Sequence, residues 1–286
     1  MSKSYIEQLV GCFGYPVEEN PSCVINNAAF EALGIQWRYL TLEAKPEKLA
    51  DCIQALKTFN MRGCNFTIPH KVEVLNYLDE LAPEVEIIGA CNTLVHKDGK
   101  LIGNNTDGKG FLRSLTGDAG VDMKGKKMLF LGAGGAARAM TVESALQGAS
   151  HITIAARTAA KGQVLVDLLN EKTDANAELL IWDGAISVPA GTDIVANATN
   201  VGMFPNVDDA PNIDYSSITS EMLACDAVMN PPDTAFLKNC RSQGAKTLDG
   251  LGMLVYQAAI GIELWTGQTP DCEVMKQALL KEYGLA

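Results

Sequence analysis

Short apolar runs alternate with segments of helical periodicity along the first part of the chain. The run IEQLVGCFG at 6–14 and the run WRYLTL at 37–42 are typical of strands. Between them, CVINNAAFEALG at 23–34 predicts a helix that ends at its glycine. A second helix at 46–60 precedes a strand at 63–68. Strands and helices in alternation predict an α/β fold.

Two helices in this region are predicted from the spacing of their apolar residues. The first begins at Pro46, which suits a first helical turn because no N–H donor is needed there. Its apolar face is formed by Leu49, Ile53, Leu56 and either Phe59 or Asn60. The second follows Lys71, with apolar residues at three-residue steps: Val72, Leu75, Leu78 and Leu81. Lys71 therefore lies near a helix start, where a cation gains nothing from the helix dipole; an ordinary surface lysine is the alternative to a functional one.

The remaining elements continue the same alternation. Residues 91–105 predict a β-hairpin, because Asp98-Gly99 supplies a tight turn. Later strands are expected at LLIW, DIVANAT, CDAVMN and AKTLDG, and two helices are expected at 252–267 and 270–284. No internal repeat, low-complexity segment or obvious flexible linker divides the sequence.

Composition and charge exclude several classes of partner. The 286 residues are 47% hydrophobic and 20% charged, which is typical of a globular protein with one large or two modest domains. The net charge of −11 and the isoelectric point near 4.8 disfavour nucleic acid and anionic membrane as partners. No apolar stretch is long enough to span a bilayer, and MSKSYIEQLVGCFG lacks the apolar core of a secretory leader. We therefore expect a cytoplasmic protein with a small-molecule partner; composition leaves monomer and homodimer equally open.

The cysteines and histidines argue against a metal site. Eight cysteines include no C-x-x-C pair, and none of the three histidines has a partner at a metal-like spacing. Reduced and mostly buried thiols are expected, as in a reducing compartment. No metal is predicted.

A glycine-rich turn carries the most specific pattern in the second half. After the apolar strand KMLFL and before a helix, the chain follows the pattern G-x-G-x-x-A from Gly132 to Ala137. Without side chains, the backbone can approach a pyrophosphate, and the helix N-terminus supplies N–H groups to bind it. The predicted dinucleotide contacts are Gly132, Ala133, Gly134, Gly135 and Ala136. The alternative is a tight turn that serves packing alone.

The strand HITIAA after this turn ends at a basic residue. An NAD site usually has Asp or Glu near this point, where it binds the ribose 2′-hydroxyl. This chain has Arg157, Thr158 and Lys161 instead, and basic or hydroxyl groups suit a 2′-phosphate. NADP is therefore the expected cofactor, with NAD as the alternative. The alternative for Arg157 and Lys161 is that both are solvated loop residues without a role in binding.

Six stretches, in the same order, resemble signatures of the shikimate dehydrogenase family. They are RGCNFTIPHK at 62–71, IGACNTLV at 88–95, GNNTDGKGF at 103–111, LGAGGAARA at 131–139, NATNVGM at 197–203 and GLGMLVYQA at 250–258. The resemblance covers nearly the whole chain. It implies a substrate-binding α/β domain at 1–106, completed by 251–286, and a Rossmann domain at 107–250. A C-terminal helix is expected to return to the first domain.

The resemblance implies catalytic roles for Lys71 and Asp107. In the family, the lysine of PHK pairs with the aspartate of NTDG, and both face the hydroxyl whose carbon gives up hydride. Oxidising an alcohol in this way releases a proton, so a positioned group has to accept it. Lys71 is assigned proton transfer, and Asp107 orientation or proton sharing. A structural salt bridge is the alternative.

Further site residues follow from the resemblance one by one. Side chains that hydrogen-bond the ring hydroxyls of a shikimate-like substrate correspond to Asn65, Thr67, Asn92 and Gln257. Cofactor contacts beyond the glycine-rich turn correspond to Thr199, Met203 and Gly250. For Asn65 and Asn92, a role as helix cap or turn residue is the alternative.

The stretch that holds the substrate carboxylate departs from the family pattern. His-Ser-x-Ser-Pro is usual there, whereas this chain has ENPSC at 19–23. Ser22 is kept and Asn20 replaces the other serine, and both are substrate-binding candidates. The family also has a tyrosine that contacts the carboxylate, and this chain has Met229 in its place. Glu19 either adds repulsion in the pocket or lies in solvent.

The expected function is oxidoreduction of the shikimate type, a reversible hydride transfer between NADP(H) and a ring alcohol or ketone. The altered stretch leaves quinate, an amino analogue or a carboxylate-free cyclic polyol as alternative substrates. A methylene-tetrahydrofolate dehydrogenase-like enzyme shares the lysine and the Rossmann plan, but not the NTDG and GLGML elements. A dinucleotide-binding sensor is the alternative from another class, against which intact Lys71 and Asp107 argue. The sequence does not separate aromatic amino acid biosynthesis from polyol catabolism.

Overall fold

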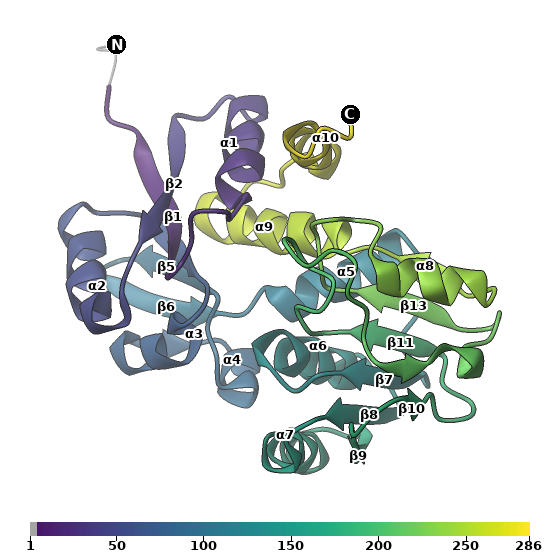
Figure 1. Cartoon of the computed structure of the whole chain (residues 1–286). Helices are drawn as coiled ribbons and strands as arrows, with labels where there is room; N and C mark the ends of the chain where they lie inside the picture. Colours follow the sequence, from purple (N-terminus) through teal and green to yellow (C-terminus); the bar gives the residue numbers. More distant parts are fainter. Residues whose placement is uncertain (1–4) are drawn as a thin grey trace. The chain divides into compact units, whose positions relative to one another are not determined.

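The computed structural model describes residues 5–286, which divide into two compact units (Figure 1). Unit 1 contains the chain up to Thr106 together with Val255–Ala286, and unit 2 contains Asp107–Leu254. Each unit has a six-stranded sheet and an apolar core of its own. The predicted α/β fold class is confirmed.

The sheet of unit 1 mixes parallel and antiparallel pairs in the order β2-β1-β3-β5-β6-β4. Its strands are β1 Gln8–Gly14, β2 Trp37–Glu43, β3 Gly63–Phe66, β4 Glu80–Leu81, β5 Thr93–Lys97 and β6 Lys100–Asn104. Strand β1 is parallel to β2 and β3, whereas β5 is antiparallel to β3 and β6. The turn between β5 and β6 is the predicted hairpin turn. Asp98 has φ 52° and Gly99 φ 78°, the positive values of a type I′ turn.

Helices complete unit 1. They are α1 Ser22–Ala32, α2 Leu49–Thr58, α3 His70–Glu73, α4 Pro83–Ile88, the part of α9 (Leu251–Thr266) from Val255 onward, and α10 Cys272–Glu282. Cys64 and Phe66 of β3 pack in a core that includes Leu56 of α2. Because side chains alternate along a strand, Asn65 points to the opposite face, where it meets Tyr39 of β2. Helix α10 lies against α1 (Figure 1), so the C-terminal helix returns to the first unit as predicted.

Two helices in unit 1 differ from the sequence prediction. The first begins as a 3-10 turn at Pro46–Lys48 and ends at Thr58, so Phe59 is 69% exposed and does not extend the apolar face. The predicted helix that follows Lys71 is wrong beyond its first turn. Helix α3 passes into a 3-10 helix at Val74–Tyr77 and then into β4. Apolar residues at three-residue steps match the period of a 3-10 helix better than that of an α-helix.

The sheet of unit 2 is parallel throughout, in the order β14-β13-β11-β7-β8-β9. Its strands are β7 Lys127–Leu131, β8 His151–Ala156, β9 Asn176–Ile181, β11 Ile194–Asn197, β13 Leu223–Asp226 and β14 Lys246–Leu248. A separate parallel pair is formed by β10 Ile186–Ser187 and β12 Ile213–Asp214. The strand order of the large sheet reverses direction between β7 and β11, as in a Rossmann fold.

Helix α5 Asp107–Gly117 precedes β7, and helices α6 Gly135–Leu146, α7 Ala159–Lys172 and α8 Ala235–Ser242 connect successive strands of the sheet. Leu129 and Leu131 of β7 share a core with Phe236 of α8. The intervening Phe130 points to the other face, where its ring lies 6.1 Å from that of Phe111 in α5. The β7 strand is therefore buried on both faces, as a parallel sheet requires. No helix within residues 5–286 is long and apolar enough to cross a membrane.

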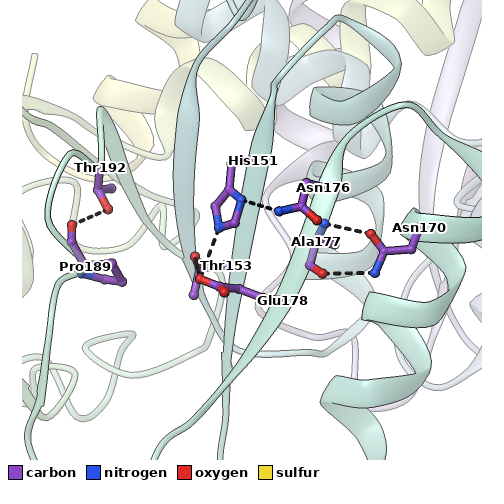
Figure 2. A network of polar contacts seen from close by, with 8 residues as sticks. All are labelled: His151, Thr153, Asn170, Asn176, Ala177, Glu178, Pro189 and Thr192. Atoms are coloured by element: carbon purple, nitrogen blue, oxygen red, sulfur yellow. Dashed lines mark hydrogen bonds and ion pairs between the residues drawn. The ribbon is translucent and has the colours of Figure 1, made fainter.

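A cluster of polar contacts joins β8 and β9 at the beginning of both strands (Figure 2). Asn176 donates to Nδ1 of His151 at 2.9 Å, so Nε2 of the neutral ring donates to Glu178 at 3.1 Å. Thr153 donates to the same carboxylate oxygen at 3.1 Å. The hydrogen bond from His151 lowers the pKa of the Glu178 carboxyl. This cluster lies at the amino ends of the strands, whereas the glycine-rich turn follows the carboxyl end of β7.

Candidate active site

A buried polar network crosses one face of the unit 1 sheet. Asn65 of β3 and Thr93 of β5 are directly paired across the two strands. The Tyr39 hydroxyl donates to Asn65 Oδ1 at 2.7 Å, and Asn65 Nδ2 donates to Thr93 Oγ1 at 2.8 Å. The residues that we call the polar network are each no more than 8% exposed: Tyr39, Asn65, Asn92, Thr93, Thr106 and Gln257. Tyr39, Thr93 and Thr106 are the members that the sequence analysis missed. Thr106 lies within NTDG and Thr93 within IGACNTLV, whereas Tyr39 is marked only by its place in an apolar strand.

Asn92 and Gln257 join this network through Thr106. Asn92 Oδ1 accepts from the Thr106 backbone N–H at 2.7 Å, and Asn92 Nδ2 donates to Thr106 Oγ1 at 3.0 Å. Thr106 Oγ1 in turn donates to Gln257 Oε1 at 3.4 Å. The fold thus brings together three predicted contacts to substrate hydroxyls, Asn65, Asn92 and Gln257. Asn92 also holds the chain at Thr106, which is the structural role named as its alternative.

The segment after β3 carries Thr67 and Lys71. Thr67 is partly exposed, and its backbone N–H donates to the Phe13 carbonyl at 3.0 Å. The buried His70 ring hydrogen-bonds the Ala44 carbonyl at 2.7 Å and anchors α3. The Lys71 carbonyl accepts from the Cys91 N–H at 2.7 Å, one residue before Asn92 of the polar network. Lys71 is therefore on a short turn fixed beside the network, and its side chain is partly exposed.

Asn20 and Ser22 lie where the chain enters α1. Asn20 Oδ1 accepts from the Ser22 backbone N–H at 2.9 Å, and Nδ2 donates to Cys12 Sγ at 3.8 Å. Ser22 is buried, and burial also raises the pKa of the Tyr39 hydroxyl well above its ordinary value. Glu19 is exposed to solvent, the second of the two positions expected for it.

Asp107 is the first residue of α5 and of unit 2, and it follows Thr106 of the polar network in the chain. Gly108 comes next, and a side chain at this position would collide with the Ala139 carbonyl of α6. Lys71 and Asp107 belong to different units, so their predicted pairing stays a prediction.

The glycine-rich turn of unit 2 forms an open cradle. Gly132 has φ 111°, which side chains rarely adopt. Gly134 is the N-cap of α6, and no atom lies within 4 Å of where a Cβ of Gly134 or Gly135 would be. The first N–H groups of α6 have no partner within the helix. Bare backbone and a helix N-terminus fit a dinucleotide pyrophosphate.

Arg138 in α6 is a cofactor candidate that the sequence analysis missed. Its Nε is buried and has no hydrogen-bond partner within residues 5–286. Burial also lowers the pKa of this guanidinium. An unpaired buried donor costs about 1–3 kcal/mol, and an anion at the helix start would remove that penalty. The signal in the sequence that could have identified Arg138 is its position as a cation three residues after Gly135.

The residues predicted to bind the 2′-phosphate are exposed where β8 leads into α7. Thr158 is the N-cap of α7, and its carbonyl accepts from the Lys161 N–H at 3.1 Å. Within the described chain, neither Arg157 nor Lys161 forms an ion pair. Both cations therefore remain available for an anion on this edge of the sheet.

The loop after β11 holds Thr199 through a buried carboxyl. Asn197 Oδ1 accepts from the Thr199 hydroxyl at 2.6 Å, and Asn197 Nδ2 donates to Asp226 Oδ1 at 3.0 Å. Asp226 also accepts from the Thr234 hydroxyl at 2.6 Å. Burial raises the pKa of Asp226 to about 7. In the sequence, Asp226 is marked only by its place in the predicted strand CDAVMN.

The last two predicted cofactor residues also belong to unit 2: Met203 lies further along the loop after β11, and Gly250 lies between β14 and α9. Met203 is partly exposed, and its N–H donates to the Asn200 carbonyl at 3.2 Å. Gly250 is buried, and a side chain there would collide with the Val228 carbonyl. Gly250 thus has a packing reason to be glycine that is independent of any cofactor.

Comparisons with known proteins place these features in one family. A family model described as the shikimate dehydrogenase substrate binding domain matches residues 12–94, and one described as the shikimate 5′-dehydrogenase C-terminal domain matches 250–280. The shikimate dehydrogenase (NADP(+)) of Desulforamulus reducens is 42% identical over 277 residues, covering 96% of this chain and 95% of the relative. This chain belongs to the shikimate dehydrogenase family.

Two solved structures have the same fold over nearly the whole chain. The ligand-free 5-ketofructose reductase of a Gluconobacter species has a TM-score of 0.93 and 44% identity, covering 98% of this chain and all of its own. Shikimate 5-dehydrogenase from Listeria monocytogenes, solved with shikimate and NAD, has a TM-score of 0.89 and 34% identity, covering 97% and 99%. The resemblance and the fold predicted from the sequence are confirmed, whereas the roles of the site residues stay predictions.

Proposed function

We propose that this protein is an NADP(H)-dependent oxidoreductase of the shikimate dehydrogenase type. It transfers hydride reversibly between the cofactor and the CH–OH carbon of a polyhydroxylated substrate such as a ring alcohol. The observation that carries the proposal is the polar network of unit 1, which lies beside the turn that holds Lys71. The network supplies amide and hydroxyl groups that suit substrate hydroxyls, and family membership supports the reaction type.

The substrate half of the site is assigned to unit 1. Substrate hydroxyls exchange hydrogen bonds with Asn65, Asn92 and Gln257, with Thr67 at the edge of the set. Each hydroxyl that is missing would leave a buried polar group unpaired, at a cost of about 1–3 kcal/mol. Lys71 takes the proton from the reacting hydroxyl during oxidation and returns it during reduction, and Asp107 orients the amine.

The cofactor half is assigned to unit 2, whose cradle and basic residues fit a phosphorylated dinucleotide. The α6 N-terminus and Arg138 bind the pyrophosphate, Arg157 and Lys161 bind the 2′-phosphate, and Thr199 lies on the loop that Asp226 fixes. When bound, the nicotinamide supplies the hydride acceptor or donor. NADP is preferred, since two unpaired cations follow β8 where an NAD site has a carboxylate.

The relatives support two substrate types. One solved member was crystallised with shikimate, and another is named for 5-ketofructose, a polyhydroxy ketone without a carboxyl group. Quinate and an amino analogue remain within the same reaction class. A sensor that binds the dinucleotide without turnover is the alternative from outside it.

We also infer a cytoplasmic location and leave a homodimer open. All eight cysteines are free thiols in the structure, and several are fully buried, as in proteins of a reducing compartment. For the assembly, size-exclusion chromatography with light scattering distinguishes monomer from dimer.

The proposal is tested by following NADPH absorbance at 340 nm with shikimate and NADP⁺, and with 5-ketofructose and NADPH. Lys71→Ala should lower kcat by about 10²–10⁴-fold, because proton transfer to or from the substrate oxygen loses its positioned group. NADP⁺ affinity should be unchanged, since the proposed cofactor contacts belong to unit 2. Lys57→Ala, which removes an exposed lysine of α2, is the matched control and should retain full activity.

Two results would contradict the proposal in different ways. Near-normal turnover by Lys71→Ala would remove the catalytic role of this lysine. NADP⁺ binding by the wild type without turnover of any polyhydroxylated alcohol or ketone would favour the sensor.

A further inference from the structure

One buried carboxyl group joins two loops at the carboxyl end of the unit 2 sheet. Asp226 is the last residue of β13 and is 2% exposed. Its Oδ1 accepts from Asn197 Nδ2 at 3.0 Å and from the Val228 backbone N–H at 2.9 Å. Its Oδ2 accepts from the Thr234 hydroxyl at 2.6 Å. These three neutral donors favour the carboxylate while burial favours the protonated form, so the charge of Asp226 is open to change near neutral pH.

No other group in contact with Asp226 titrates near neutral pH. Within residues 5–286, no cation forms an ion pair with it. The titratable groups near it are the thiols of Cys225 on β13 and Cys240 on α8, and the hydroxyl of Tyr215. Burial raises the pKa of all three, to about 12 for Cys240 and Tyr215, so they stay neutral. The charge of Asp233, just before α8, is exposed to water and paired with an arginine.

Two side chains connect the Asp226 carboxyl to the glycine-rich turn. Asn197 on β11 donates to Asp226, and its Oδ1 accepts from the Thr199 hydroxyl at 2.6 Å. Thr199 lies against the turn, because a Cβ at Gly132 would be 2.8 Å from its methyl carbon. Strands β7, β11 and β13 are neighbours, so this edge includes the point where the strand order reverses (Figure 1). Dinucleotides bind across that point, outside the carboxyl ends of the strands.

The half of the cofactor on this side is the half that changes charge. Because the adenosine half is assigned to the end of β8, the nicotinamide half belongs to the side of β11 and β13. The nicotinamide ring is a cation in NADP⁺ and is neutral in NADPH. A buried carboxylate attracts such a cation more strongly than an exposed one, since little water lies between them to screen the charge.

We infer that Asp226 makes the site select the redox state of its cofactor: the carboxylate favours NADP⁺, and the protonated form does not discriminate. This inference rests on the proposed function. Asp226 acts through its charge, with Asn197 and Thr199 between it and the glycine-rich turn. Because coupling between two binding events is reciprocal, NADP⁺ that binds the protonated protein displaces the Asp226 proton to solvent, whereas NADPH leaves it in place.

The test measures the dissociation constants of NADP⁺ and NADPH between pH 6 and pH 8.5 by titration calorimetry. The quantity followed is the Kd of NADPH divided by the Kd of NADP⁺. The 2′-phosphate, which titrates at about pH 6, is common to both forms and cancels in this ratio. For the wild type, the ratio should rise by about fivefold to tenfold as Asp226 ionises. Repeating the titration near pH 7 in buffers of different ionisation enthalpy should show more proton release with NADP⁺ than with NADPH.

Two variants and a control connect the effect to Asp226. Asp226→Asn never ionises, so its ratio should not depend on pH. Thr234→Val removes a donor that favours the carboxylate, so the rise should move to higher pH, and it serves if Asp226→Asn does not fold. Asp193→Asn is the control, because it removes a carboxylate that holds the Lys127 backbone N–H at the other end of the same sheet. It should keep the wild-type dependence.

The outcomes separate this inference from the proposed function. A wild-type ratio that is constant with pH overturns the inference, and hydride transfer by the same protein would leave the proposed function intact. An Asp226→Asn protein that binds both dinucleotides more weakly but keeps the pH dependence also contradicts the inference, because the carboxyl would then only hold the loops. A folded wild type that binds neither dinucleotide overturns both.

Discussion

Two basic residues at the end of β8 are proposed to select NADP over NAD. Arg157 and Lys161 are exposed, lie within one turn of each other at the start of α7, and form no ion pair within residues 5–286. The Arg157→Ala/Lys161→Ala double variant should weaken NADP⁺ binding by about 10–100-fold, as two charge-assisted contacts are lost. NAD⁺ binding should change little, since NAD⁺ has no 2′-phosphate.

Titration calorimetry with both dinucleotides measures this difference. Lys172→Ala, at the exposed C-terminal end of α7, is a control that keeps the helix and removes one cation from it. If the double variant lost affinity for NADP⁺ and NAD⁺ equally, the two cations would act on the pyrophosphate or on folding and not on the 2′-phosphate.

Replacing the glycines at two helix starts should affect different properties: Gly108→Ala should lower stability, and Gly134→Ala should lower NADP⁺ affinity. A Cβ at Gly108 would meet the Ala139 carbonyl of α6, so Gly108→Ala should destabilise the protein by about 1–3 kcal/mol as α5 is displaced. A Cβ at Gly134 meets nothing in the protein and is compatible with its φ of −87°. Gly134→Ala should therefore keep its stability and lose about tenfold in NADP⁺ affinity, because the methyl group occupies the cradle.

Urea unfolding and cofactor titration on both variants check the pair of expectations. A Gly134→Ala protein that binds NADP⁺ as tightly as the wild type would show that the dinucleotide does not approach this backbone. A Gly108→Ala protein of unchanged stability would show that the two helices adjust at little cost.

Elements with a strong local signal could be predicted from the sequence, and those set by packing could not. The hairpin at Asp98-Gly99 and the strand, turn and helix around Gly132 were recognised because their backbone conformations require glycine. The sequence prediction makes helix α3 too long, because Val72 is 64% exposed and the three-residue spacing belongs to a 3-10 helix. Among the site residues, Tyr39 and Asp226 carry no motif, and only the register of neighbouring strands reveals them.

At the scale of the whole molecule, two carboxyl groups of unit 2 give the stability opposite dependences on pH. Glu178 has a lowered pKa, so its contribution is present above its unfolded pKa and is lost as pH falls through the folded value. Asp226 has a pKa raised to about 7, so its contribution is present below the unfolded pKa and is lost as pH rises through about 7. As pH rises from the unfolded pKa of Asp226 to above its folded pKa of about 7, ionisation of this carboxyl should lower the free energy of unfolding by up to about 4 kcal/mol.

Unfolding free energies of the wild type and Asp226→Asn between pH 5 and pH 8 isolate this effect. Asparagine has no proton to lose, so the variant should show a flatter dependence on pH over this range. Parallel curves for the two proteins would mean that Asp226 keeps one charge state throughout. His151→Ala tests the opposite dependence at low pH. Because Glu178 then lacks the hydrogen bond from His151, the variant should lose less stability than the wild type below pH 5.

The interruption of unit 1 by unit 2 in the chain has a consequence for biosynthesis. Residues 107–254 leave the ribosome as a complete unit, and they do so before Gln257, the last member of the polar network, has been made. Domains generally fold in the order of synthesis, but here the first unit to begin is the last to be finished. Until this part of α9 emerges, Thr106 of the polar network lacks its partner Gln257, so a nascent chain would acquire its dinucleotide cradle before its substrate site is complete.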